Sequence, residues 1–130
     1  MFDFKGIDHI NMTVKDLDKS VDYYSRLFGF KTVEQGDYNG TPYKIIGLTN
    51  KAMLCIYENK DLDVKNNNIG HFGFHIKFTD DIVKKLEEQN ANVRYYNGQA
   101  VIQYPNSKSI YINDPDGNQI ELSEQFAGGL

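Results

Sequence analysis

Two histidines and one glutamate in this chain of 130 residues have the types and positions of metal ligands. His9 and His71 occupy equivalent places in two similar segments, and Glu121 lies late in the second half of the chain. Two imidazoles and one carboxylate form a facial set that leaves positions open for water and substrate on Fe(II), Mn(II) and similar ions. Open positions are typical of catalytic metal sites, whereas structural sites are closed. We therefore interpret these three residues as candidate ligands of a divalent metal.

The two histidines belong to an internal repeat of alternating segments. Residues 7–14 (IDHINMTV) align with residues 69–76 (IGHFGFHI) at a constant offset of 62 positions. A period of two predicts strands with one apolar and one polar face. The apolar faces carry Ile10, Met12 and Val14 in the first copy, and Phe72, Phe74 and Ile76 in the second. The polar faces carry His9, Asn11 and Thr13, and His71, Gly73 and His75. A solvated sheet surface is an alternative explanation for Asn11, Thr13 and His75.

A helical pattern follows each of these strands and predicts a cover for its apolar face. The residues expected to cap and end the helices are Asp16 or Asp18 and Gly29 in the first copy, and Thr79 or Asp80 and Asn90 in the second. Further strands are expected at 31–35, 44–48 and 52–57, and at 92–96, 109–113 and 118–123. The sequence Pro115-Asp116-Gly117 predicts the turn before the last strand, and residues 36–42 are interpreted as a loop.

These elements predict an α+β fold of two repeated βαβββ modules, which form a curved mixed sheet around a cleft for a metal or ligand. We expect a single domain over residues 1–126. Its first module would span about 5–58 and its second about 69–124, joined by the polar, asparagine-rich linker 59–68. Residues 127–130 are expected to form a tail.

Composition narrows the range of partners. The net charge is −4 and no basic run is present, which disfavours nucleic acid and anionic membranes. Apolar stretches are only a few residues long, so no membrane span is expected. The first residues lack the layout of a signal peptide, and Cys55 is the single cysteine. These features indicate a cytoplasmic protein.

The chain resembles the vicinal oxygen chelate superfamily, which includes glyoxalase I, fosfomycin-resistance thiol transferases, extradiol dioxygenases and bleomycin-resistance proteins. The likeness covers roughly residues 7–124 and is carried by IDHINMTVKDLDKSVDYYSRLFGF, GHFGFHI and IYINDPDGNQIEL. It implies metal ligands at His9, His71 and Glu121, with Fe, Mn, Ni or Zn as the ion. Sites in this superfamily are often shared between two chains, so the resemblance also implies a homodimer.

Three positions depart from the individual activities of that superfamily. Cys55 stands where glyoxalase I has a glutamate ligand, and a thiolate there is a further candidate to contact the metal. Asn11 stands where the fosfomycin enzymes have threonine or cysteine. Residues 102–104 replace the upstream histidine of the ring-cleaving dioxygenases. Lyase or isomerase, thiol transferase and dioxygenase chemistry therefore all stay open.

The resemblance implies a metal-dependent enzyme that binds a small molecule through two adjacent oxygens and polarises them. Tyr111 and His75 are the candidate acid/base groups beside the metal, and His75 is also a candidate to orient a ligand. One alternative is a non-catalytic protein that sequesters a small molecule, as bleomycin-resistance proteins do. Another is a degenerate member of the superfamily with a structural role.

Overall fold

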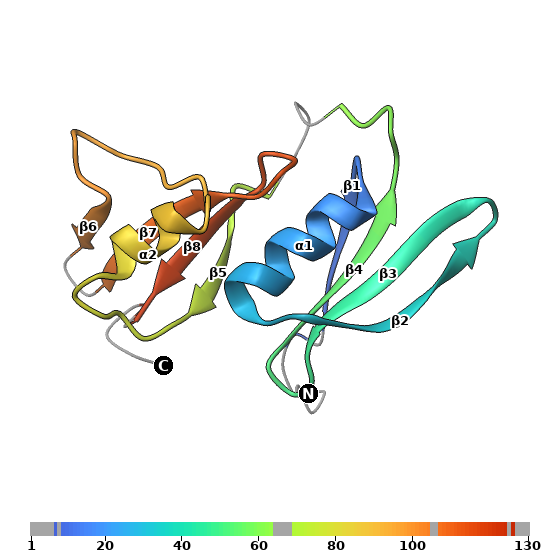
Figure 1. Ribbon diagram of the computed structural model, residues 1–130, viewed down its shortest axis with the longest axis horizontal. Coiled ribbons are helices and arrows are strands. Elements are labelled where there is room, and N and C mark those ends of the chain that lie inside the picture. The colour runs from blue at the N-terminus through green and yellow to red at the C-terminus, as the bar shows by residue number, and fades with distance from the viewer. Residues whose placement is uncertain (1–6, 8, 64–68, 105–106, 125, 127–130) are drawn as a thin grey trace, which may run out of the picture. The chain divides into compact units, whose positions relative to one another are not determined.

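The computed structural model describes residues 7, 9–63, 69–104, 107–124 and 126. Contacts divide the chain into two compact units, residues 1–63 and 64–130. Each unit contains one helix and one four-stranded sheet with parallel and antiparallel pairs, which confirms the predicted α+β class (Figure 1). The predicted tail 127–130 and the second half of the predicted linker, 64–68, lie outside the described residues.

The first unit is a βαβββ module, as its sequence predicts. Its elements in chain order are β1 (Ile10–Val14), α1 (Leu17–Phe28), β2 (Lys31–Tyr38), β3 (Thr41–Leu48) and β4 (Ala52–Glu58). The sheet has the order β1-β4-β3-β2, in which β1 and β4 are parallel and the other pairs are antiparallel. Helix α1 contacts β2, β3 and β4 and buries its own Leu17 and Tyr24.

Both ends of α1 are fixed by side chains or by glycine. The Asp16 side chain accepts a hydrogen bond from the backbone N–H of Lys19 at 3.0 Å, so Asp16 is the N-terminal cap rather than Asp18. The Glu58 side chain accepts from the N–H of Leu17, also at 3.0 Å, and thereby ties the helix to β4. Gly29 ends the helix with a left-handed φ of 69°, which confirms the predicted stop.

The prediction of a loop at residues 36–42 is wrong. Strands β2 and β3 continue through this segment and pair as far as Tyr38 and Thr41. The turn consists of Asn39 and Gly40, which both have positive φ values, 52° and 85°. Asn-Gly is a strong signal for a two-residue hairpin, because both central residues of such turns need positive φ. This local signal outweighs the polar composition of the segment.

The second unit repeats the first. Its elements are β5 (Phe72–His75), α2 (Ile82–Glu88), β6 (Val101–Tyr104), β7 (Ser107–Asn113) and β8 (Gln119–Ser123). The sheet order β5-β8-β7-β6 matches that of the first unit, and the first and last strands of the module are again the parallel pair. The same order in both units confirms the repeat that the offset of 62 positions predicts.

Two details of the second unit correct the sequence analysis. No strand forms at 92–96, where only isolated bridges join Val93 to Ile112 and Tyr96 to Gln99. Asn92 has a left-handed φ of 56°, which interrupts an extended backbone. Neither Thr79 nor Asp80 caps α2. Asp81 holds that position without a side-chain cap, and the Thr79 hydroxyl donates to its carboxylate. The helix ends at Glu88, and Asn90 has a left-handed φ of 53°, so the predicted end near Asn90 is confirmed.

The core of the second unit lies on one face of β7 and β8, and the polar residues lie on the other. Ile110, Ile112, Ile120 and Leu122 are fully buried.

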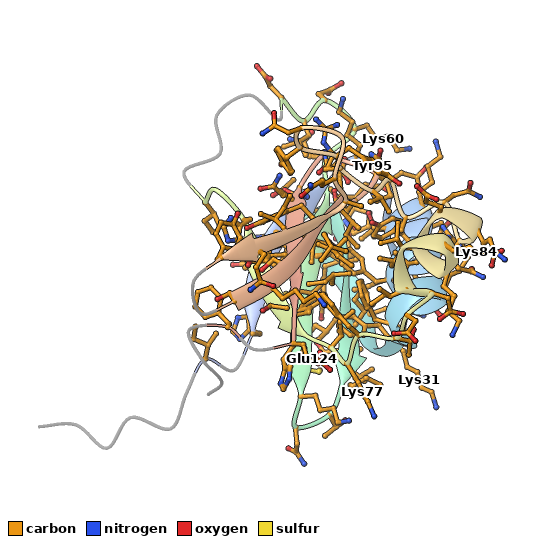
Figure 2. All side chains as sticks on the ribbon, turned by 90° about the vertical axis from the view of Figure 1, so that its left-hand side faces the viewer. Lys31, Lys60, Lys77, Lys84, Tyr95 and Glu124 are labelled. Atoms are coloured by element: carbon orange, nitrogen blue, oxygen red, sulfur yellow. The ribbon has the colours of Figure 1, made fainter. Side chains whose placement is uncertain are left out.

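Charged side chains such as Lys31, Lys77 and Lys84 extend outward from the ribbon (Figure 2). Over the described part of the chain, no helix combines the length and apolarity needed to cross a membrane.

Candidate functional site

The polar face of the second sheet is built by two adjacent parallel strands. β5 pairs with β8 so that Gly73 lies opposite Glu121 and His75 lies opposite Ser123. Side chains on a strand alternate between faces, so positions 71, 73 and 75 share the face that carries Glu121 and Ser123. The exposed and half-buried residues alternate along β5 as the sequence predicts. The sheet register therefore pairs residues 48 positions apart in the sequence.

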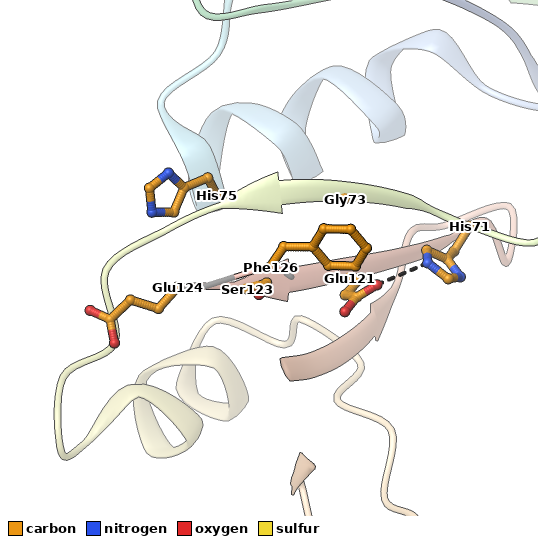
Figure 3. Close-up of a pocket in the computed structure, with 7 residues that line it drawn as sticks. All are labelled: His71, Gly73, His75, Glu121, Ser123, Glu124 and Phe126. Atoms are coloured by element: carbon orange, nitrogen blue, oxygen red, sulfur yellow. Dashed lines mark ion pairs between the residues drawn. The ribbon is translucent and has the colours of Figure 1, made fainter. Parts of the chain in front are cut away.

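His71 and Glu121, two of the three predicted ligands, are in direct contact. The Nε2 atom of His71 lies 2.9 Å from Oε2 of Glu121, as the dashed line in Figure 3 shows. The other carboxylate oxygen, Oε1, accepts a 2.5 Å hydrogen bond from the hydroxyl of buried Ser109. The Glu121 side chain is 5% exposed, whereas that of His71 is 41% exposed. Ser109 thus fixes the carboxylate on its buried side and leaves Oε2 on the accessible side.

This pair fits a divalent metal. Imidazole nitrogen and carboxylate oxygen suit Zn, Fe, Mn and Ni. Metal–ligand bonds of this kind are about 2.1 Å long, so two ligand atoms whose bonds to the ion form roughly a right angle lie about 3 Å apart. The separation of His71 Nε2 and Glu121 Oε2 is close to that value. The exposure of His71 leaves one side of the pair open to further ligands.

Tyr111 stands next to the pair and is held in its neutral form. It lies opposite Glu121 in the β7–β8 register, and its ring centroid is 5.8 Å from that of His71. Its hydroxyl is 3.0 Å from that of Tyr104. Burial raises the pKa of Tyr111, and the hydrogen bond to Tyr104 and the nearby negative charge of Glu121 raise it further. Tyr111 is therefore suited to donate a hydrogen bond or a proton, and unsuited to act as a base.

A cavity of about 340 Å³ opens beside the His71–Glu121 pair within the second unit. The residues that line it come from β5 and the residue before it, from β8 and from the segment after β8: His71, Gly73, His75, Glu121, Ser123, Glu124 and Phe126 (Figure 3). His75, a predicted acid/base residue, thus lines the same cavity as the two candidate ligands His71 and Glu121. A volume of this size lies at the lower end of the range for small-molecule sites.

The remaining candidates lie in the first unit. His9 is exposed and directly precedes β1. Cys55 lies on β4 between Asn11 of β1 and Ile45 of β3, and the pKa of neighbouring Tyr57 is raised by burial and by Cys55. Within either unit, the described residues include no group of three His, Cys, Asp or Glu side chains placed to share a metal. The roles of His9 and Cys55 are therefore still predictions.

Four residues of the site were not among the predicted site residues: Ser109, Ser123, Glu124 and Phe126. Ser109 and Ser123 were accessible to prediction, because each is two positions from a candidate and shares its strand face. Ser109 precedes Tyr111 on β7, and Ser123 follows Glu121 on β8. Phe126 lies beyond the last strand, where no periodic signal applies.

Residues 6–122 match the family model of the Glyoxalase/Bleomycin resistance protein/Dioxygenase superfamily. The chain belongs to this superfamily. The resemblance to glyoxalases, fosfomycin-resistance enzymes and dioxygenases is thereby confirmed. The matched residues include parts of both units.

Individual members of the superfamily show the range of its activities. The chain is 31% identical to the trivalent organoarsenical cleaving enzyme of Bacillus sp. (strain MD1), over 88% of this chain and 70% of that protein. It is also 31% identical to the metallothiol transferase FosB of Lysinibacillus sphaericus, over 91% of this chain and 81% of that protein. The glyoxylase/bleomycin resistance protein/dioxygenase domain from Frankia sp. EAN1pec has the same fold, with a TM-score of 0.77 at 18% identity over 94% of this chain and 98% of that one.

The raised pKa of Tyr111 predicts how stability changes at alkaline pH. In the unfolded chain a tyrosine ionises near pH 10, whereas folded Tyr111 keeps its proton to higher pH. Its contribution is therefore complete below about pH 10 and is lost as pH rises above that value. Tyr111→Phe should make the fall in urea midpoint between pH 9 and pH 11 shallower than in wild type. The exposed Tyr38→Phe is the control, and equal slopes for wild type and Tyr111→Phe would contradict the prediction.

Proposed function

We propose that this protein is a metal-dependent enzyme that binds a small molecule through two adjacent oxygens. His71 and Glu121 would bind the ion, and His9 would supply the third protein ligand. The observation that carries this proposal is the 2.9 Å contact between His71 and Glu121 at the edge of a cavity. The support for His9 is its equivalence to His71 in the repeat. The metallothiol transferase relative supports metal dependence.

The bound metal would supply a Lewis acid that polarises the substrate oxygens. The chain's own residues would position the ligands and handle protons. Ser109 holds the buried oxygen of Glu121, so the carboxylate presents its other oxygen in one orientation. Tyr111, kept neutral by burial and by Tyr104, would donate a hydrogen bond to a developing negative charge. His75, exposed on the cavity wall, would exchange a proton with substrate or water.

Metal binding and its pH dependence test this proposal. Imidazole ligands must be neutral to bind, so protons compete with the metal as pH falls through the histidine range. Affinity for Zn(II), measured by equilibrium dialysis, should therefore fall as the pH is lowered from 7.5 through the histidine range. Mn(II), Fe(II) and Ni(II) are compared in the same way. Failure to retain one metal ion per chain at pH 7.5 would contradict the proposal of a metal-dependent enzyme. It would favour a non-catalytic protein that binds a small molecule.

We also propose that the protein is a homodimer, since sites in this superfamily are often shared between two chains. A shared site would bring ligands from two chains to one ion. Light scattering at micromolar protein should give twice the mass of the chain. A monomer mass under these conditions, with metal present, would argue against it.

A further inference from the structure

We infer that Tyr104 is a positioning residue of the proposed site: its hydroxyl donates a hydrogen bond to the Tyr111 hydroxyl, so that the single hydroxyl proton of Tyr111 is directed toward the substrate. The two hydroxyl oxygens are 3.0 Å apart, within hydrogen-bond distance. This inference rests on the proposed function, in which Tyr111 donates a hydrogen bond to the substrate. It goes further by adding a residue outside the predicted site and by assigning the direction of the hydrogen bond between the two tyrosines.

Tyr104 and Tyr111 approach each other along one face of the second sheet. Tyr104 ends β6 and lies opposite Ser107 of β7, four residues before Tyr111. Side chains of a strand alternate between faces, so Tyr104, Ser107 and Tyr111 share the polar face of the sheet. The Gln103 side chain donates to the backbone carbonyls of Tyr104 and Ser107 at 2.8 and 3.1 Å, which holds this end of the strand pair. The sheet register therefore brings the Tyr104 hydroxyl to Tyr111.

The charge of Glu121 determines which of the two hydroxyls is the donor. A tyrosine hydroxyl carries one proton, and its oxygen can also accept a hydrogen bond. Glu121 lies opposite Tyr111 in the β7–β8 register, and its negative charge raises the pKa of Tyr111, in addition to burial and the bond to Tyr104. This carboxylate attracts the Tyr111 proton and repels a lone pair of the Tyr111 oxygen. The Tyr111 proton is thus directed to the Glu121 side, and the proton between the two tyrosines comes from Tyr104.

The difference in burial between the two tyrosines favours the same direction. Tyr111 is 9% exposed, whereas Tyr104 is 41% exposed. The Tyr104 oxygen can therefore accept hydrogen bonds from water while its proton is donated to Tyr111. In a chain of hydrogen bonds that run in one direction, each bond polarises the next and strengthens it. Tyr104 consequently strengthens the hydrogen bond that Tyr111 donates, and it acts on the substrate through Tyr111.

Binding of acetohydroxamate, a small chelator with two adjacent oxygens, to the Co(II)-loaded protein tests this inference. Co(II) is used in place of Zn(II) because its visible absorption changes when a further ligand joins the ion. Tyr111→Phe removes the donor and should weaken binding roughly tenfold, as expected for a hydrogen bond to a charged group. Tyr104→Phe removes only the polarisation of that bond and should weaken binding about twofold to fourfold. The spectrum of each variant before addition of the chelator should equal that of wild type.

The double variant shows whether Tyr104 acts through Tyr111. Tyr104→Phe should have no further effect in the Tyr111→Phe background, because the hydroxyl that it positions is absent there. A purely structural contribution of Tyr104 would instead add to the loss.

Tyr96→Phe is the matched control and should bind the chelator as tightly as wild type. The Tyr96 ring also meets that of Tyr111, at a centroid distance of 5.7 Å, but its hydroxyl accepts from the Gln119 side chain. An unchanged affinity in Tyr104→Phe or Tyr111→Phe, or losses that add in the double variant, would overturn the role of Tyr104 and leave the proposed metal site intact. If acetohydroxamate does not change the spectrum of the Co(II)-loaded wild type, the proposed function falls, and this inference falls with it.

Discussion

Replacing His71 with alanine is expected to remove most of the bound metal without unfolding the protein. His71 is one of three proposed ligands, and its imidazole directly faces Glu121. Loss of a residue that merely orients a ligand costs 10- to 100-fold in affinity, so loss of a ligand should cost at least about 100-fold. The side chain is 41% exposed, and the apolar face of β5 is untouched. The cost in stability of the metal-free protein should stay below about 1 kcal/mol.

The neighbouring histidine of the same strand provides the control. His75 shares the exposed face of β5 and the same cavity, but it lies opposite Ser123 rather than Glu121. His75→Ala should therefore keep metal near one equivalent per chain after loading and desalting. Elemental analysis and a melting curve of each variant, with and without metal, separate loss of binding from loss of fold. Equal metal content in wild type and His71→Ala would remove the main support for the proposal that the protein is a metal-dependent enzyme.

Replacing Asp114 with alanine is expected to produce the largest loss of stability among surface-loop substitutions, about 2–4 kcal/mol. Asp114 is 3% exposed and organises the turn between β7 and β8. Its Oδ1 accepts from the backbone N–H groups of Asp116 and Asn118 at 2.9 and 2.8 Å. Its Oδ2 accepts from the Asn118 side chain at 2.8 Å. Alanine would leave these buried and half-buried donors without their partner.

Asp37→Ala tests whether burial is the reason for that cost. Asp37 makes a comparable turn contact, since its Oδ1 accepts from the N–H of Gly40 at 2.7 Å in the β2–β3 hairpin. That hairpin is exposed, so water replaces the carboxylate and the loss should be about 0.5–1 kcal/mol. Urea unfolding at pH 7 measures both variants. A loss below 1 kcal/mol for Asp114→Ala would show that the turn does not depend on its carboxylate.

The sequence by itself determined the architecture of each module, because its signals are local. Alternation over 7–14 and 69–76 specified two strands and assigned each residue to a face, since side chains of a strand alternate. Gly29 marked the end of α1, because glycine adopts the left-handed conformation there without steric cost. The repeat then predicted two modules with the same chain order of elements, and both sheets have the same strand order. Two local signals were misread where single asparagines with positive φ decided the backbone, at Asn39 and Asn92, and the cap of α2 was placed one or two residues too early.

Only the tertiary structure decided which polar side chains touch one another. The sequence placed His71 and Glu121 on polar faces, but the parallel register of β5 and β8 sets their 2.9 Å contact. The hydrogen bond from Ser109 to Glu121 depends on a second pairing, the antiparallel register of β7 and β8. A shift of one residue in that register would turn these side chains to the opposite face. Periodicity assigns a residue to a face, whereas contacts between strands depend on hydrogen-bonded pairing of segments far apart in the chain.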